Sequence, residues 1–205
     1  MRCVNCGAFS LRTICAACAA NLAECRLGMR QVEGFSVFYY YGYSEIRELI
    51  LSKHHEYGAV VLARIASLSL AKFPLHLQRE ISANSQNYEA FKTDGIFKFN
   101  AVPLDDDARS GYSHTAILAR ALKSELIEPK FHCLRAQNRV KYSGQSLEFR
   151  LKHKRNFKIL TPPKFPVILV DDIITSGLSM LQARESLIQG GFTPVCGLVL
   201  ANAKE

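Results

Sequence analysis

The stretch VILVDDIITSGLS, residues 167–179, changes character twice. A short apolar run, Pro166–Val170, predicts a buried strand, and two adjacent carboxylates, Asp171 and Asp172, follow it directly. A loop of small residues comes next, and Leu178–Gln189 then predicts a helix. In a parallel α/β sheet, ligands bind beyond the carboxyl ends of the strands, where such a loop enters a helix. The stretch therefore indicates a ligand site at the edge of a sheet.

The rest of the chain continues this alternation of strands and helices. Gly190 and Gly191 end the helix, and Val195–Leu200 predicts the next strand. Gln78–Asp94 has no clear pattern and predicts either irregular structure or a surface helix. The other predicted elements are a strand at Phe35–Tyr41, a helix through Ile46–Ile50 capped by Ser44, a helix through Val60–Leu70 broken before Pro74, a strand at Phe97–Leu104 and a helix at Ser113–Glu125. The pattern predicts an α/β fold with a parallel sheet flanked by helices.

The residue types in the opening stretch also indicate a class of ligand. Thr175, Ser176, Gly177 and Ser179 are small enough for backbone N–H groups to approach an anion, and the helix that begins near Leu178 adds its positive end. The two preceding carboxylates are acceptors suited to ribose hydroxyls or to hydrated Mg²⁺. A phosphate cradle beside a diol acceptor predicts a ribose 5-phosphate site. The alternative is a plain strand-to-helix turn whose two aspartates cap the helix.

Five of the seven cysteines crowd the first 25 residues. Cys3 and Cys6 form one Cys-x2-Cys pair, and Cys15 and Cys18 form a second, a spacing typical of a four-thiolate zinc site. We therefore predict a zinc ribbon at residues 1–25 whose folding depends on the metal, followed by one larger domain at 26–205. Redox-active or disulfide-bonded pairs are the alternative. The remaining cysteines, Cys25, Cys133 and Cys196, are expected to be ordinary buried residues.

Composition indicates a soluble protein. The chain has 205 residues, 48% of them hydrophobic, and no uncharged apolar run long enough to span a membrane. We expect a cytoplasmic location and no membrane insertion. The net charge of +8 is compatible with an anionic partner such as nucleic acid or a phosphorylated metabolite.

A basic stretch lies between Lys130 and Lys158, where Glu148 is the one acidic residue. Phe131, Tyr142, Phe149 and Phe157 are interleaved with its cations, which suits phosphate contact combined with base stacking on single-stranded DNA. A solvated basic face is the alternative. The candidate DNA contacts are Arg135, Arg139, Lys141, Arg150, Lys152, Lys154 and Arg155.

Residues 167–179 resemble the phosphoribosyl pyrophosphate (PRPP) signature of type I phosphoribosyltransferases, in which an apolar strand, two acidic residues and a Thr-x-Gly-x-Ser/Thr loop follow one another. The resemblance implies a phosphoribosyltransferase-like sheet that binds PRPP with Mg²⁺. It implies that Asp171 and Asp172 contact the 2- and 3-hydroxyls of the ribose and act as the catalytic pair. It also implies that the 5-phosphate is held by Thr175, Ser176, Gly177, Leu178 and Ser179.

Over nearly its whole length the chain resembles the ComF family, phosphoribosyltransferase-like proteins linked to bacterial competence and DNA uptake. Its motifs stand in family order: the four-cysteine ribbon, Arg47-Glu48-Leu49-Ile50 with Lys53, Val102-Pro103-Leu104, Gly111-Tyr112-Ser113-His114, Gln145, Arg155-Asn156-Phe157 and the PRPP loop. Membership implies a PRPP-binding protein of natural transformation that binds single-stranded DNA. A DNA-uptake helicase or a recombination mediator is the implied protein partner. The alternative is an active phosphoribosyltransferase with an unidentified base or nucleotide acceptor.

One segment departs from the family pattern. The family usually places several arginines after its Val-Pro element, where they suit pyrophosphate, whereas this chain has Asp105-Asp106-Asp107-Ala108-Arg109-Ser110. These carboxylates repel pyrophosphate directly, or they hold Mg²⁺ through water and leave Arg109 as the nearest cation. They could instead only solvate a turn. Catalysis needs the charge of the leaving pyrophosphate neutralised, so the departure affects transfer more than binding.

Overall fold

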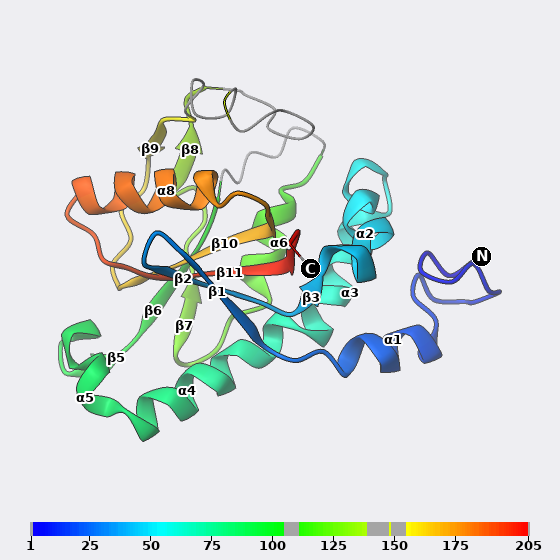
Figure 1. Cartoon of the computed structure of the whole chain (residues 1–205), viewed down its shortest axis with the longest axis horizontal. Helices are drawn as coiled ribbons and strands as arrows, with labels where there is room; N and C mark the ends of the chain where they lie inside the picture. Colours follow the sequence, from blue (N-terminus) through cyan, green and yellow to red (C-terminus); the bar gives the residue numbers. More distant parts are fainter. Residues whose placement is uncertain (1, 105–110, 139–147, 149–154, 205) are drawn as a thin grey trace.

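The computed structural model describes residues 2–104, 111–138, 148 and 155–204. Within these ranges a seven-stranded sheet forms the centre of the molecule, in the order β1-β2-β11-β10-β6-β7, with β3 also paired to β11 (Figure 1). The β1–β2 pair is antiparallel, and the other pairs of this sheet are parallel. The mixed α/β fold with a mostly parallel sheet is therefore confirmed. Its strands are β1 Gly28–Val32, β2 Phe35–Tyr39, β3 Tyr41–Gly42, β6 Phe99–Pro103, β7 Ile127–Pro129, β10 Val167–Ile174 and β11 Pro194–Asn202.

Helices cover both faces of this sheet, and two short hairpins lie outside it. The helices are α1 Ala16–Ala23, α2 Tyr43–Leu51, α3 Gly58–Leu68, α4 Phe73–Ala83, α5 Ser85–Tyr88, α6 His114–Arg120 and α8 Leu178–Gln189, with 3-10 turns η1 Ser52–His54, η2 Leu70–Lys72 and η3 Glu89–Phe91. The hairpins pair β4 Lys92–Thr93 with β5 Ile96–Phe97, and β8 Leu134–Ala136 with β9 Phe157–Ile159.

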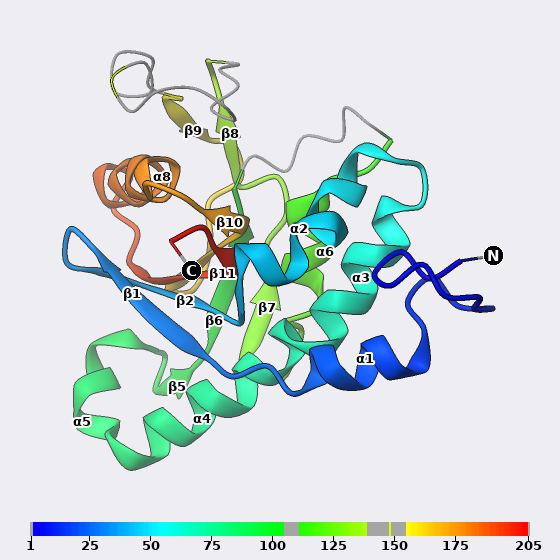
Figure 2. The ribbon, with the colours of Figure 1, turned by 45° about the vertical axis from the view of Figure 1, so that its right-hand side comes forward.

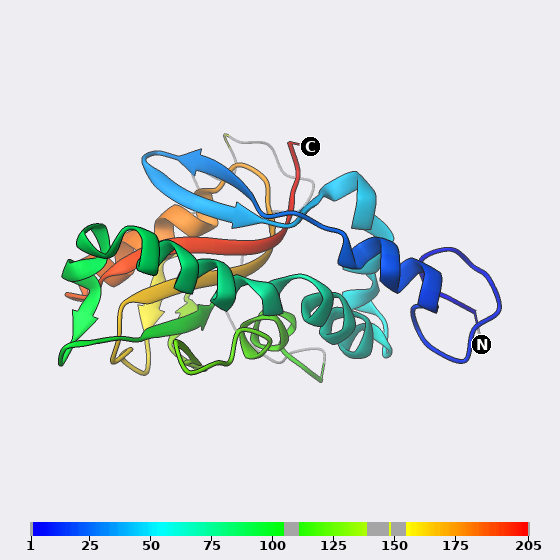
Figure 3. The same cartoon turned by 90° about the horizontal axis from the view of Figure 1, so that it is seen from below.

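The side chains of β10 alternate between two cores. Ile168 and Val170 lie in a core shared with α1, α2, α3, α4 and α6, whereas Val167 and Leu169 lie in a second core with α8 and the β8–β9 hairpin. Successive residues of a strand point to opposite faces, so a fully buried strand needs apolar residues at every position. Figure 2 shows α8 on one side of the sheet and α2, α3 and α6 on the other. In Figure 3, α4 runs across the sheet face that α8 does not cover.

Several predicted element boundaries were wrong for local reasons. Ser44 does not cap α2, because the helix begins at Tyr43 and Gly42 is its N-cap. The Glu45 carboxylate accepts a hydrogen bond from the Gly42 N–H at 2.5 Å. By contrast, the predicted helix break before Pro74 is found, because α3 ends at Leu68. Pro74 lies in the first turn of the next helix, α4, where a missing N–H is tolerated. The helix predicted to end at Glu125 ends at Arg120.

One helical run among the described residues is long and apolar enough to cross a membrane by length and composition. This run, Gly58–Ala83, joins α3, η2 and α4, and its most apolar window has a mean hydropathy of 1.4 and is 44% buried. Val61, Leu62 and Ile65 of α3 are fully buried against the sheet. The run therefore contributes buried side chains to the main core.

Candidate functional site

The two aspartates lie inside a strand, not directly after one as the apolar run predicted. Strand β10 continues to Ile174, because β11 pairs with it through Asp171↔Val199 and Ile174↔Asn202. Parallel pairing on one side is sufficient to keep a polar stretch extended. The carboxylates therefore project from the carboxyl end of the central strand, immediately before the Thr175–Ser179 loop.

Asp172 is held by a lysine that is 119 residues away in the sequence. The ammonium of Lys53, on η1, lies 2.5 Å from the Asp172 carboxylate, and the two side chains are 21% and 5% exposed. Tyr112 supports this turn by donating a hydrogen bond to the Lys53 carbonyl oxygen at 2.9 Å. Burial opposes ionisation of Asp172, but Lys53 and His114 outweigh it and lower the pKa of Asp172 to about 2. Asp172 is consequently ionised at neutral pH.

Asp171 has the opposite electrostatic environment. Burial and the adjacent Asp172 charge raise the pKa of Asp171 to about 8, with the charge of Arg155 opposing that rise. The Arg155 backbone N–H donates to the Gln182 side chain at 2.9 Å, which ties this part of the backbone to α8. Arg155 was predicted to contact DNA, and the structure brings its charge close enough to act on Asp171.

His114 joins these carboxylates in a possible cation site. One ligand atom from each of His114, Asp171 and Asp172 lies within 4.8 Å of the others. The two carboxylates suit Mg²⁺, which prefers oxygen, whereas the imidazole suits transition metals better or an outer position beyond a bound water. The donor set can thus hold a divalent cation at the carboxyl end of β10.

The loop after β10 lines a small cavity of about 30 Å³, which Asp171 and the residues from Ile173 to Met180 surround. Gly177 has a φ of +85°, and a Cβ on it would lie 2.6 Å from Val32 of β1. Both the left-handed backbone and this close approach require glycine. Arg30 fastens the loop by donating to the Thr175 carbonyl at 2.8 Å and to the Asn202 side chain at 3.1 Å.

The predicted helix after this loop is confirmed at both ends, as α8. Its N-terminus follows Gly177 directly, and the Leu181 N–H makes the first helical bond to the Gly177 carbonyl at 3.0 Å. The free N–H groups of this first turn point toward the loop, and the helix dipole adds partial positive charge there. An anion held by the loop would therefore lie beside Asp171, which lines the same cavity.

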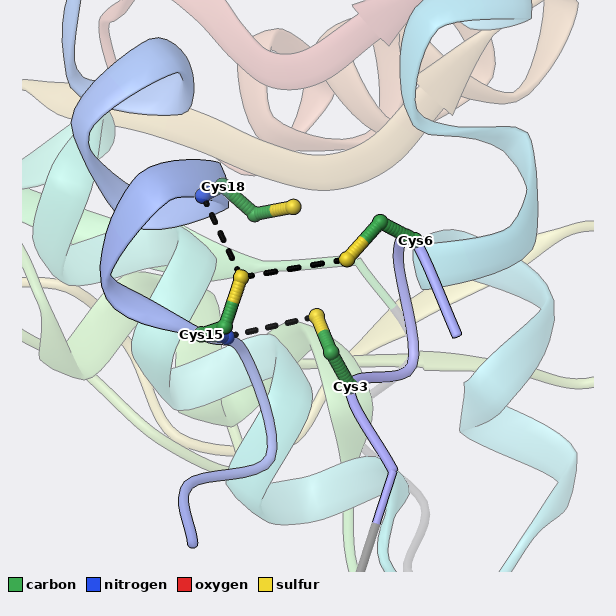
Figure 4. Close-up of side chains that lie close together, drawn as sticks. All are labelled: Cys3, Cys6, Cys15 and Cys18. Atoms are coloured by element: carbon green, nitrogen blue, oxygen red, sulfur yellow. Dashed lines mark hydrogen bonds between the residues drawn. The ribbon is translucent and has the colours of Figure 1, made fainter. Parts of the chain in front are cut away.

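The four N-terminal cysteines converge as predicted (Figure 4). Their sulfur atoms lie within 4.8 Å of one another, and the Cys6 and Cys15 sulfurs are 3.8 Å apart. With Zn–S bonds of about 2.3 Å, a tetrahedral zinc site has sulfur–sulfur edges of about 3.8 Å. The Cys15 N–H donates to the Cys3 sulfur at 3.2 Å, and the Cys18 N–H donates to the Cys15 sulfur at 3.5 Å. The cluster can therefore hold a metal ion, and its geometry fits zinc.

This cysteine module is packed into the main core. Cys3, Ile14, Cys18 and Leu22 are all buried, in the same cluster as α2 and α3. Segment 2–25 is too short to bury a core by itself. Loss of a metal there would consequently disturb packing beneath α2 and α3, the elements on either side of Lys53.

The basic stretch is only partly described. Arg135 on β8 and Lys158 on β9 stand opposite each other in the hairpin, and both are exposed. Phe157 was predicted to be available for stacking, which is wrong, because it is 7% exposed in the core under α8, whereas Phe131 is 37% exposed. Six predicted site residues lie outside the described residues: Arg109, Arg139, Lys141, Arg150, Lys152 and Lys154. The acidic Asp105–Asp107 also lies outside them.

Sequence reasoning assigned no role to three residues that the structure places around this site. Lys53 and His114 stood in family-like motifs, and Arg30 lay in a segment that had no predicted element. Nothing in the sequence around Lys53 indicates a partner 119 residues away, so its ion pair with Asp172 could not be predicted.

Comparison of the chain with protein-family models and with curated proteins finds no match to either.

Proposed function

We propose that this protein is a ComF-type, phosphoribosyltransferase-like protein that binds PRPP with Mg²⁺ and handles single-stranded DNA during natural transformation. The observation that carries the proposal is that two carboxylates and a loop of small residues lie together at the carboxyl end of β10. Asp171, Asp172 and the Thr175–Ser179 loop lie together there, and α8 begins at the loop. A ribose 5-phosphate has the matching arrangement of a diol and a phosphate.

Each residue then has a definable task. Backbone N–H groups of residues 175–179 and the first turn of α8 hold the 5-phosphate, and Arg30 fixes the loop by its hydrogen bond to the Thr175 carbonyl. Lys53 keeps Asp172 ionised, so that this carboxylate accepts hydrogen bonds from ribose hydroxyls. Mg²⁺ would neutralise pyrophosphate charge when bound. Its approach would also favour ionisation of Asp171, because a nearby cation stabilises the charged form of a carboxyl group.

DNA binding is proposed on charge and exposure. The net charge of +8 and the exposed Arg135–Lys158 pair suit a phosphate backbone, and Phe131 offers an exposed ring nearby in the chain. A cytoplasmic protein of DNA uptake meets single strands and their helicase or recombination mediator, and these are the proposed partners. Structural Zn²⁺ at the four cysteines completes the proposal.

Catalytic transfer from PRPP to a base or nucleotide is the second candidate. The observation that favours it is the cation-binding set of His114, Asp171 and Asp172 beside the anion loop, since a cation there can neutralise charge on a departing pyrophosphate. Arg155 adds a further positive charge at this edge.

The deciding experiment measures PRPP binding and pyrophosphate release on the same zinc-loaded protein. Calorimetric titration of PRPP with Mg²⁺ should saturate in wild type and fail in Asp171→Asn/Asp172→Asn, while the distant exposed variant Glu185→Gln should bind as wild type does. Pyrophosphate release is then followed with bases, nucleotides and single-stranded DNA. Release that depends on the aspartates establishes a transferase, and binding without release leaves a PRPP-responsive protein. Absence of PRPP binding in the wild type contradicts both.

A second measurement tests the DNA contacts. Labelled single strands should bind wild type with a steep salt dependence, and Arg135→Gln/Lys158→Gln should reduce the slope of log affinity against log salt by about 1.4. Arg79→Gln/Lys123→Gln removes the same charge from exposed positions elsewhere and serves as the control. Equal losses in the two double variants would show that net charge alone attracts the DNA.

A further inference from the structure

A second cavity lies away from the proposed PRPP site. It has a volume of about 330 Å³ and lies between α4–α5 and the beginning of β11, where Val195 and Cys196 form part of its wall. Figures 1 and 3 show α5 beside the amino end of β11, whereas the C-terminus marks the other end of that strand. The anion loop follows β10 at that other end, since Ile174 pairs with Asn202. A ligand in this cavity would be separate from PRPP.

Four aromatic rings line this cavity. Phe38 and Phe73 form one pair with centroids 5.6 Å apart, and Tyr88 and Phe91 form a second pair at 6.1 Å. Phe73 is buried, whereas the other three rings are only partly buried and keep some exposed surface. The volume falls within the usual range for small-molecule sites, which are largely apolar with a few polar groups.

The charge of the lining is negative although the protein is strongly basic. Among the described residues that line the cavity, Glu80 is the one with a full charge at neutral pH. No described cation forms an ion pair with Glu80, whose carboxylate accepts only a 3.4 Å hydrogen bond from Asn84. Burial and then the Glu80 charge raise the pKa of Tyr88, one of the rings that line the cavity.

We propose that this cavity binds an alkylated ammonium group of a small molecule. Aromatic faces attract cations through their quadrupoles, and alkyl substituents on nitrogen match the apolar surface of the rings. Glu80 supplies the opposite charge at the rim, and His76 and Asn87 offer hydrogen-bonding groups for a polar part of the same ligand. The attraction is local, because the net charge of +8 repels cations from the molecule as a whole.

Choline and its neutral isostere 3,3-dimethylbutan-1-ol test the proposal, since they share a shape and differ in charge. Each is titrated into the full-length, zinc-loaded protein, and binding is followed by backbone NMR shifts. Choline should produce saturable shifts in α4, α5 and β2, with about tenfold higher affinity than the alcohol. Glu80→Gln should remove most of that preference, and Tyr88→Leu should weaken choline binding several-fold.

Glu185→Gln is the matched control, because Glu185 is also an exposed helical glutamate that accepts a hydrogen bond from an amide four residues later. It should leave choline binding unchanged. Equal affinity for choline and the alcohol, or shifts that map outside the cavity, would overturn the proposal. Failure of either compound to give saturable shifts would overturn it as well. PRPP binding is measured separately, so its outcome does not affect this test.

Discussion

Removal of the Lys53 ammonium is the most informative single change. Lys53→Met keeps an unbranched side chain one atom shorter than lysine and leaves Asp172, only 5% exposed, without its counter-ion. The lowering of the Asp172 pKa from 3.8 to about 2 corresponds to roughly 2 to 3 kcal/mol of net stabilisation of the ionised carboxylate. Since the variant loses this attraction and retains the burial penalty, we expect a loss of about 3 to 5 kcal/mol in the free energy of unfolding.

Urea unfolding of zinc-loaded protein at pH 7, followed by circular dichroism, measures this loss. Lys98→Met is the control, because the Lys98–Glu128 pair has a longer separation of 3.2 Å and side chains that are 32% and 55% exposed. Such an exposed pair contributes about 1 kcal/mol or less. Lys53→Met/Asp172→Asn should recover most of the stability, since no buried charge then remains. Equal small losses in both single lysine variants would refute the reasoning.

The same pair predicts how stability depends on pH. Asp172 has a depressed pKa in the folded state, so its contribution is complete above the unfolded value of about 4 and disappears as the pH falls from about 4 to 2. The Lys53→Met variant should show a much smaller decrease over this interval. A wild type whose unfolding free energy stays constant between pH 4 and pH 2 contradicts the assigned ion pair.

Three further outcomes are expected. The folded pKa of Asp171 is raised to about 8, so its contribution to wild-type stability is lost progressively as the pH rises from about 4 through 8. Asp171→Asn should remove this decline and be more stable than wild type at pH 8, and urea unfolding across this range checks both outcomes. Gly177→Ala should lose more stability than Gly191→Ala, since both glycines have positive φ but only Gly177 would also place a Cβ against Val32, and thermal melts compare the two directly. Complete chelation should shift NMR signals of α1 and of the core residues of α2 and α3 together, and signals confined to residues 2–25 would show that the cysteine module is energetically separate.

Local chemistry made several features predictable. Both ends of the helix Leu178–Gln189 were predicted correctly, because a positive-φ glycine precedes it and a Gly-Gly pair follows it. The cysteine cluster was also predictable, because metal-ligand spacing within a short segment leaves few other arrangements. Features of this kind depend on residues close together in the chain.

Other boundaries depended on partners elsewhere in the chain. The extension of β10 through Ile174 needs the register of β11, and polar Asp171 and Asp172 gave no local reason to continue a strand. Phe157 lies among basic residues in the sequence, which suggested an exposed ring. The β8–β9 hairpin instead places its side chain in the core. Tertiary contacts therefore overrode local composition at both places.

The sequence by itself determined the α/β class, the acidic pair followed by a loop of small residues, and the convergence of four cysteines, because periodicity and short-range spacing encode each of these. Only the tertiary structure decided which charges act on that acidic pair. Lys53, His114 and Arg155 come from three separate segments, and the fold gathers them around the two aspartates. Burial there lowers the local dielectric and strengthens their electrostatic effects. Two adjacent aspartates with opposite pKa shifts follow from that assembly, since chemically identical side chains differ only in their surroundings.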